Sequence, residues 1–248
     1  MPRRVNQLLD SVRGSLQILA IYFLNTNFHN KRLSPGGKRF LEFTWGSNAN
    51  FTMKESNEQS NSSKYERFLI VVEISAALWV HIMAFETTLR KFLDNVLQHI
   101  YRVIEWWLVP NLLYPNDRKD VELAIKRLKK RDLPINNKNI VANLSLSFWI
   151  ELLSRRYHQK IWMKIVKFFP VYPGRRENFY NKAREIRNLR NAIAHHAPIL
   201  RRNLIRDHAY LHELSALLDP HLADEVQKRS RVLDLLLNAR LVGSGGGI

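Results

Sequence analysis

The stretch FLIVVEISAALWVHIMAF, residues 68–85, decides the fold of this chain. It is about as long as a minimal transmembrane helix, and it is apolar on nearly every helical face. Glu73 and His81 lie inside it, and a charge in hydrocarbon is costly unless it has a partner. No second span of this kind is found in the sequence. We therefore interpret the stretch as the buried central helix of a helical bundle.

The residues on both sides of this stretch continue the helical pattern. Apolar residues recur every three to four positions, runs of strand-like alternation do not stand out, and glycine and proline are sparse at nine each. The pattern predicts an all-α fold. The central helix is expected from Tyr65 to Leu108, with a bend, and Pro110 stops it. Further helices are expected at 5–25, 117–131, 145–156, 158–169, 177–196, 203–218 and 221–240.

The domain organisation follows from composition along the chain. Residues 65–242 are expected to form one helical domain, and residues 1–64 a looser N-terminal arm. Within the arm, residues 46–64 are rich in Asn, Ser and Glu, which predicts a flexible loop. The glycine-rich residues 243–248 are expected to be a flexible tail.

Charge and cysteine content restrict the function. The chain of 248 residues has no cysteine, which excludes disulfides, thiolate zinc sites and cysteine nucleophiles. Its 39 Lys and Arg against 22 Asp and Glu give a net charge of +17, which calls for a polyanionic partner, either nucleic acid or an anionic membrane. The amphipathic N-terminus carries Asp10 and Arg13 and does not resemble a secretory signal, so a cytoplasmic protein is expected.

The segment REIRNLRNAIAHHAPI, residues 184–199, carries the candidate chemistry. Pro198 should end its helix near His196, so that both histidines lie in the last turn. There the helix dipole favours the imidazolium form and nearby arginines disfavour it, which suits acid–base work near neutral pH. On a helical wheel one face is apolar and the opposite one polar. The apolar face contains Phe179, Ile186, Leu189 and Ile193, and the polar face contains Arg184, Asn188, Asn191 and His195.

Positive charge is densest around these histidines. Between Arg175 and Arg206 there are nine Lys and Arg against Glu177 and Glu185. The aromatic side chains of this region offer stacking surfaces for bases, so RNA is the natural substrate. Those aromatic residues are Phe179, Tyr180 and Tyr210.

Three segments resemble a known family. Residues 190–195, Arg-Asn-Ala-Ile-Ala-His, match the Arg-Asn-x-x-x-His motif of the HEPN ribonuclease superfamily. The longer string RNAIAHHAPI resembles the version found in Abi-like (abortive infection) proteins of bacteria. Glu86 and Arg90 are similar to the Glu-x-x-x-Arg helix of that family, and residues 146–149 resemble its Ser-Phe segment. The resemblance spans about residues 65–240.

The resemblance implies an α-helical bundle that dimerises and places two motifs in one cleft, where single-stranded RNA such as tRNA or mRNA is cut without metal or cofactor. His195 would be the general acid or base, Arg190 would stabilise charge on the phosphate, and Asn191 would orient His195. His196 would have a supporting role. Glu86 would either pair with Arg90 or anchor the motif helix. The expected RNA-binding residues are Arg184, Arg187, Arg201 and Arg202. A role as a toxin in phage defence, with a possible antitoxin partner, is also implied. Ala197 departs from the family, which often has Glu there.

Other interpretations remain open. The chain could be a non-catalytic HEPN module that binds RNA or a partner, or a membrane-associated sensor built around residues 68–85. His208 and His212 could share a metal, but a third ligand is not obvious, so a solvated helix face is favoured. Trp106 and Trp107 are expected to pack in the core.

Overall fold

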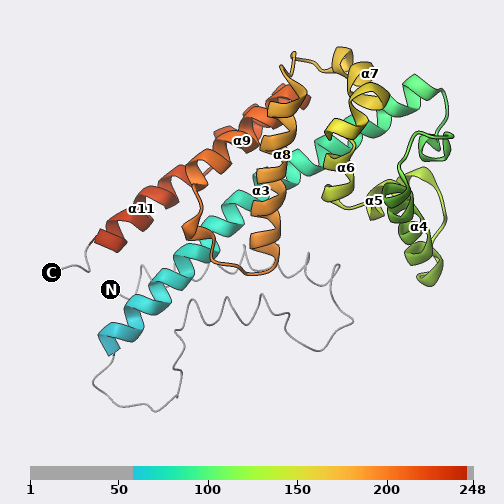
Figure 1. Cartoon of the computed structure of the whole chain (residues 1–248). Helices are drawn as coiled ribbons and strands as arrows, with labels where there is room; N and C mark the ends of the chain where they lie inside the picture. The colour runs from blue at the N-terminus through green and yellow to red at the C-terminus, as the bar shows by residue number, and fades with distance from the viewer. Residues whose placement is uncertain (1–57, 245–248) are drawn as a thin grey trace. The chain divides into compact units, whose positions relative to one another are not determined.

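The structure is a computed structural model in which residues 58–244 are described. These residues contain nine α-helices and no β-strand, which confirms the all-α prediction (Figure 1). The α-helices are α3 (Glu58–Tyr101), α4 (Pro115–Lys130), α5 (Asn137–Asn143), α6 (Leu146–Glu151), α7 (Met163–Ile165), α8 (Arg176–Ala194), α9 (Leu204–Leu218), α10 (Pro220–Lys228) and α11 (Val232–Ser244). Short 3₁₀ segments lie at Trp106–Leu108, Arg155–Tyr157, Val166–Phe168 and Ile199–Arg201, and a π-helical turn spans His158–Trp162.

Helix α3 buries one stripe of its surface and exposes another. The buried stripe follows the three-to-four spacing of an amphipathic helix, whereas Val80 is 55% and Met83 is 44% exposed. By length and composition α3 is the one candidate membrane span in the described part of the chain, and 39% of its most apolar window is buried. A buried core helix meets the same criteria. The buried stripe comprises Ile74, Leu78, Ile82, Phe85, Leu89, Leu93 and Leu97.

The chain divides into two compact units, where the sequence predicted one domain. Of the described residues, unit 1 comprises 58–80, 189–208 and 230–244. Unit 2 comprises His81–Asn188 and Ala209–Arg229.

An aromatic cluster forms part of the core of unit 2. Trp106 is fully buried and Trp107 is 3% exposed, so the prediction that both pack in the core is confirmed. The Trp106 ring lies 6.0 Å from Trp149 and 6.4 Å from Phe148, centre to centre. Its Nε1–H donates to the Asp94 carboxylate at 2.9 Å, which satisfies the buried indole nitrogen.

Several predicted boundaries were wrong. Helix α3 begins at Glu58, so residues 58–64 are helical and do not belong to a flexible loop. It ends at Tyr101 because Arg102 adopts a left-handed backbone with φ of 56°. The helix expected at 221–240 is broken at residues 229–231 into α10 and α11.

Helix α5 was not predicted from the sequence, because its seven residues are too few to form a recognisable apolar stripe. Asn136 caps its N-terminus by accepting a hydrogen bond from the Asn139 N–H at 2.9 Å. Residues 243–244 belong to α11, so the predicted tail is at most 245–248. The predictions for residues 5–25, 46–57 and 245–248 lie outside the described residues.

Candidate functional site

Helix α8 carries the predicted motif on a well-defined amphipathic scaffold. Glu177 lies in its first turn, where the helix dipole favours an acidic side chain. The predicted apolar face is buried, with exposures of 1%, 0%, 0% and 6% for the four residues Phe179, Ile186, Leu189 and Ile193. On the opposite face Arg184, Asn188 and His195 are exposed and Asn191 is half-buried. The predicted orientation of this helix is therefore confirmed.

The C-terminal end of α8 is a Schellman motif. The Ala197 N–H donates to the Ala192 carbonyl at 2.8 Å, and the His196 N–H donates to the Ile193 carbonyl at 3.1 Å. This pair of bonds requires a left-handed residue between the helix and the outgoing chain, and glycine usually occupies that position. Here the residue is His196, with φ of 54°.

His196 is therefore held in a costly backbone conformation. The left-handed region costs an L-residue about 1–2 kcal/mol, although histidine enters it more often than most side chains. Strain of this kind clusters at functional sites. A glycine at this position would relieve the strain.

The two adjacent histidines have different environments. His196 is half-buried, and burial lowers its pKa from 6.5, with the charge of His195 adding to the effect. At neutral pH His196 is accordingly a neutral imidazole that can accept a proton. His195 is exposed, and its main-chain N–H donates to the Asn191 carbonyl at 2.9 Å. Orientation of the His195 ring by the Asn191 side chain stays a prediction.

Arg190 is half-buried in unit 1. Its Cζ atom lies 5.9 Å from the centre of the Trp79 ring, a cation–π contact. Trp79 is itself 4% exposed, so it gives the guanidinium a rigid support. A planar fork held in this way suits the oxygens of a phosphate.

Arg201 and Arg202, both expected to bind RNA, differ in the structure. Arg201 is exposed. The Arg202 Nε donates to the Asp207 carboxylate at 2.8 Å, and Arg206 contacts the other oxygen at 3.2 Å. Asp207 is 1% exposed, so Arg202 neutralises a buried charge. An additional contact of Arg202 with RNA stays a prediction.

The other predicted residues belong to unit 2. Glu86 forms an ion pair with Arg90, which also donates to the Ala142 carbonyl at 3.3 Å. Glu86 therefore pairs with Arg90, which was one of its two expected roles. That Glu86 anchors the motif helix stays a prediction. Arg184 lies over the Tyr180 ring at 5.7 Å, and Arg187 pairs with Glu151 at 3.6 Å.

His208 corrects one interpretation of the sequence. It is 4% exposed and lies 3.2 Å from the Ser230 hydroxyl through its Nε2, so it does not lie on a solvated helix face. Among the residues that the structure describes, no three potential metal ligands gather in one place.

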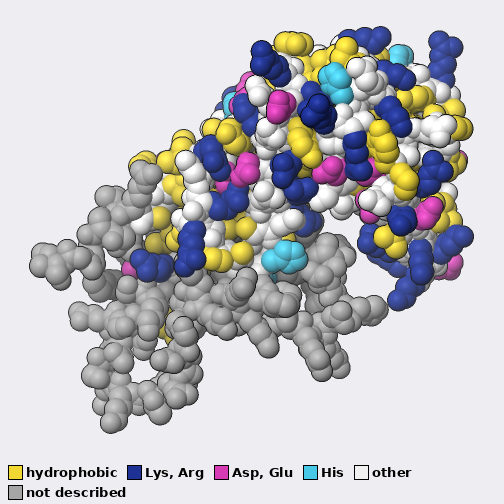
Figure 2. All heavy atoms as spheres, viewed as in Figure 1, with side chains coloured by type: hydrophobic (Ala, Val, Ile, Leu, Met, Phe, Trp, Pro, Cys, Tyr) yellow, Lys and Arg dark blue, Asp and Glu magenta, His cyan; other side chains and the backbone are white. Residues whose placement is uncertain are grey.

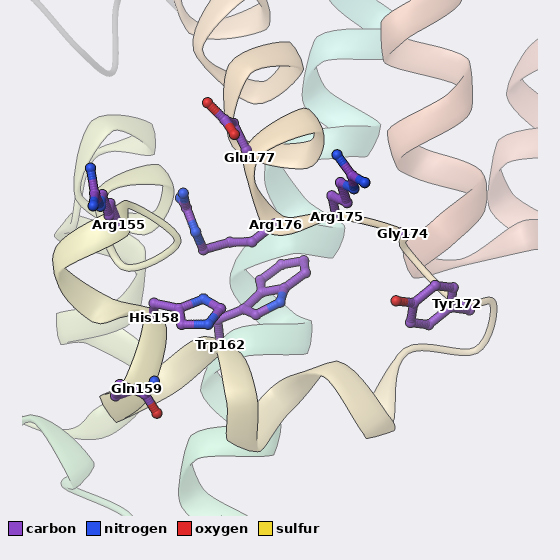
Figure 3. A pocket seen from close by; sticks show the side chains of 9 residues that line it. All are labelled: Arg155, His158, Gln159, Trp162, Tyr172, Gly174, Arg175, Arg176 and Glu177. Atoms are coloured by element: carbon purple, nitrogen blue, oxygen red, sulfur yellow. The ribbon is translucent and has the colours of Figure 1, made fainter.

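Unit 2 contains a cavity that was not predicted from the sequence. It has a volume of about 650 Å³, and Figure 3 shows the side chains around it. In the sequence Arg175 and Arg176 stand out only as part of a charged region, although the aromatic Tyr172 and the turn residue Gly174 shortly before them could have indicated the cavity. The lining residues are Arg155, His158, Gln159, Trp162, Tyr172, Gly174, Arg175, Arg176 and Glu177.

The surface agrees with the excess of basic residues in the sequence. Figure 2 shows many Lys and Arg side chains on the viewed face, with fewer Asp and Glu among them. No protein-family model, curated protein or solved structure matches the chain.

Proposed function

We propose that this protein is a metal-independent endoribonuclease in which Arg190 and His195 form the catalytic pair. The observation that carries the proposal is the end of α8, where a strained, half-buried histidine, His196, directly follows an exposed one, His195. Arg190 lies one and a half turns earlier on the same helix. The match of residues 190–195 to the Arg-Asn-x-x-x-His motif and the charge of +17 support it.

The proposed reaction needs one base and one acid. The RNA 2′-hydroxyl loses its proton to the base and attacks the adjacent phosphorus. The bond from phosphorus to the 5′-oxygen then breaks, and the acid protonates that oxygen. The products are a 2′,3′-cyclic phosphate and a 5′-hydroxyl. His195 transfers a proton, Arg190 stabilises the negative phosphate oxygens, Asn191 orients His195, and His196 supports it.

A two-fold dimer would bring Arg190 and His195 together in one site. Positions five apart on an α-helix differ by about 140° in direction, so Arg190 and His195 do not share one face. Two copies that meet along a two-fold axis would let the Arg190 of each act with the His195 of the other. We therefore propose a homodimer of HEPN-type bundles with the α8 motifs in a common cleft.

Single-stranded RNA, tRNA or mRNA, is the proposed substrate. The RNA-binding surface would include Arg184, Arg187 and Arg201, with Arg202 also committed to Asp207. The resemblance to Abi-like proteins suggests a toxin of phage defence that acts in the cytoplasm and is restrained by an antitoxin.

The deciding experiment compares wild type with His195→Ala on one single-stranded RNA, with and without EDTA. We expect wild type to cut in EDTA and to leave cyclic phosphate ends, and His195→Ala to lose about 10²–10⁴-fold in rate. RNA affinity should be nearly unchanged. His221→Ala, which removes another exposed histidine, is the matched control.

Each alternative predicts a different result. Equal cutting by wild type and His195→Ala would contradict the catalytic role, and cutting abolished by EDTA would indicate a metal nuclease. Binding without cutting by the wild type would support a non-catalytic RNA-binding module.

The dimer has its own test. Light scattering should give twice the chain mass at micromolar concentration. Arg190→Ala and His195→Ala proteins, each inactive alone, should recover part of the activity when mixed and allowed to exchange subunits. A fully active monomer, or no recovery in proven mixed dimers, would overturn the shared site.

A further inference from the structure

The cavity of about 650 Å³ in unit 2 has a composition that suits one class of ligand. Its volume lies within the range of small-molecule sites. Three arginines line it against one carboxylate, Glu177, so the cavity favours an anion. Two aromatic side chains, Trp162 and Tyr172, also line it (Figure 3).

The floor of the cavity is a rigid aromatic surface. Trp162 is 3% exposed and packs against Phe169 and Phe179, with ring centres 5.8 Å and 6.0 Å away. Tyr172 is 75% exposed and stands on the loop that precedes α8. An exposed aromatic ring next to cationic groups is the arrangement with which proteins stack nucleobases.

The backbone of the cavity is irregular at two places. His158, Gln159 and Trp162 all belong to the π-helical turn His158–Trp162, in which the Met163 N–H reaches the His158 carbonyl five residues back. Such turns are rare and occur frequently at functional sites. Gly174 has φ of 71°, and a Cβ there would meet no atom within 4 Å. The positive φ, and not a lack of space, therefore favours glycine at this turn, which presents Tyr172 and Arg175.

Two of the three arginines are available to a ligand. Arg155 and Arg175 are exposed, and among the described residues neither side chain forms a hydrogen bond or ion pair. Arg176 donates to the Leu153 carbonyl at 3.0 Å and is partly committed to the fold. Arg156, adjacent in sequence, is bound to Asp117 at 2.8 Å. Asp117 therefore neutralises Arg156, whereas its sequence neighbour Arg155 faces the cavity.

We propose that this cavity binds a nucleotide, with Arg155 and Arg175 holding its phosphate and Tyr172 stacking on its base. Three features support this ligand class together: the excess of guanidinium groups, the exposed ring beside them, and a volume that accommodates one nucleotide. The nucleotide is either a free one or a unit of an RNA strand. The inference does not depend on RNA cleavage, because the Arg190–His195 motif plays no part in it.

The first experiment measures binding of adenosine 5′-monophosphate, adenosine and inorganic phosphate to the full chain by calorimetry. We expect the monophosphate to bind at least about tenfold more tightly than adenosine, since charge-assisted hydrogen bonds to phosphate are strong. The Arg155→Ala/Arg175→Ala variant should lose about tenfold or more. Tyr172→Ala should lose about fivefold or more, and Tyr172→Phe should bind as wild type does.

The matched control removes the same charge elsewhere. Lys129→Ala/Lys130→Ala deletes two exposed lysines of α4 and should change affinity by less than about twofold, because screened charges outside the cavity contribute little. Equal losses in the two double variants would mean diffuse electrostatic attraction and would overturn the site.

A second arm identifies the source of the nucleotide. Binding of a single-stranded RNA decamer is measured in the His195→Ala background, so that the RNA stays intact whether or not the chain is a nuclease. If Arg155→Ala/Arg175→Ala weakens both ligands and the monophosphate competes with RNA, the cavity holds a unit of the strand. If only the monophosphate is affected, the ligand is a free nucleotide. No monophosphate binding at millimolar concentration, with equal RNA affinity in both double variants, contradicts the proposal.

Discussion

Charged side chains lie against an apolar core in two regions of the molecule, the Asp117 cluster of unit 2 (Asp117, Arg156 and Tyr157) and the segment 190–196 of unit 1. The two regions differ in how these side chains are bound and exposed. Asp117 is 3% exposed and accepts hydrogen bonds from the Tyr157 hydroxyl at 2.6 Å and from Arg156 at 2.8 Å. The Tyr157 oxygen in turn accepts the Tyr114 N–H at 3.0 Å. Burial and the bond to Asp117 raise the pKa of Tyr157, so its hydroxyl remains a hydrogen-bond donor well above neutral pH.

The segment 190–196 is distinguished by solvent exposure and backbone strain, whereas the Asp117 cluster is a buried network of hydrogen bonds. His195 is exposed, His196 is strained at φ of 54°, and Arg190 rests over Trp79. A closed network of hydrogen bonds specifies the fold, because removing one member leaves the others buried and unsatisfied. A segment with an exposed histidine and backbone strain is expected to contribute less to stability. The comparison predicts that substitutions in the two regions will affect different properties.

After His195→Ala, the largest effect is expected for Arg190. Arg190→Ala should reduce RNA cleavage by about 10²–10³-fold, because a donor aimed at the phosphate charge is lost. Arg190→Lys keeps a positive charge beside Trp79 and loses the planar fork, so cleavage should fall strongly while the melting temperature stays close to wild type. Full activity of Arg190→Lys would show that the charge alone suffices.

Asp117→Ala should leave the motif intact and destabilise the fold. Removing the buried carboxylate leaves the buried Tyr157 hydroxyl without its acceptor, which costs about 1–3 kcal/mol in the free energy of unfolding. Urea titration measures this, and Asp120→Ala on the exposed side of α4 is the control, with a change within about 0.5 kcal/mol. A small loss for Asp117→Ala would mean that this cluster does not determine stability.

Substitutions of His196 measure the cost of its left-handed backbone conformation. His196→Gly should be more stable than His196→Ala by about 1 kcal/mol, because only glycine adopts the left-handed region without a steric penalty. Thermal unfolding of both variants measures the difference. An alanine variant as stable as the glycine variant would show that the end of α8 rearranges and that the strain is not maintained.

Arg201 and Arg202 should separate binding from stability. Arg201→Ala should lower the slope of log affinity against log salt by about 0.7 for single-stranded RNA, the value for one lost phosphate contact. Arg202→Ala should instead lower stability, since buried Asp207 loses its nearest cation. Identical salt slopes for wild type and Arg201→Ala would remove Arg201 from the RNA surface.

The smallest expected effect is the pH dependence at His196. Burial holds its folded-state pKa below 6.5, so the unfolded chain binds more protons between the two pKa values. Stability contributed by neutral His196 is therefore fully present above pH 6.5 and is lost as the pH falls toward the folded-state pKa. His196→Asn, which tolerates the left-handed backbone, should lose less stability than wild type between pH 7 and 5. Parallel pH profiles would contradict the assignment.

Regular helices could be predicted from the sequence, and their ends could not. The apolar periodicity of α8 gave the correct buried face because side-chain direction on a helix depends only on local geometry. The start of α5, by contrast, depends on a single hydrogen bond, which the Asn139 N–H donates to the Asn136 side chain at 2.9 Å, and periodicity does not report such a bond. The division into two units could not be predicted from the sequence either, because it depends on contacts between segments that are distant along the chain.

By itself the sequence determined the all-α class, the buried face of α8, the excess positive charge and the candidate motif at residues 190–196. Only the tertiary structure decided which charged residues belong to the fold and which remain available. Arg155 and Arg156 are adjacent and chemically identical, yet one faces a cavity and the other binds Asp117, 39 residues away. Ion pairing depends on distances in space, and local sequence patterns contain no information about a partner so distant along the chain.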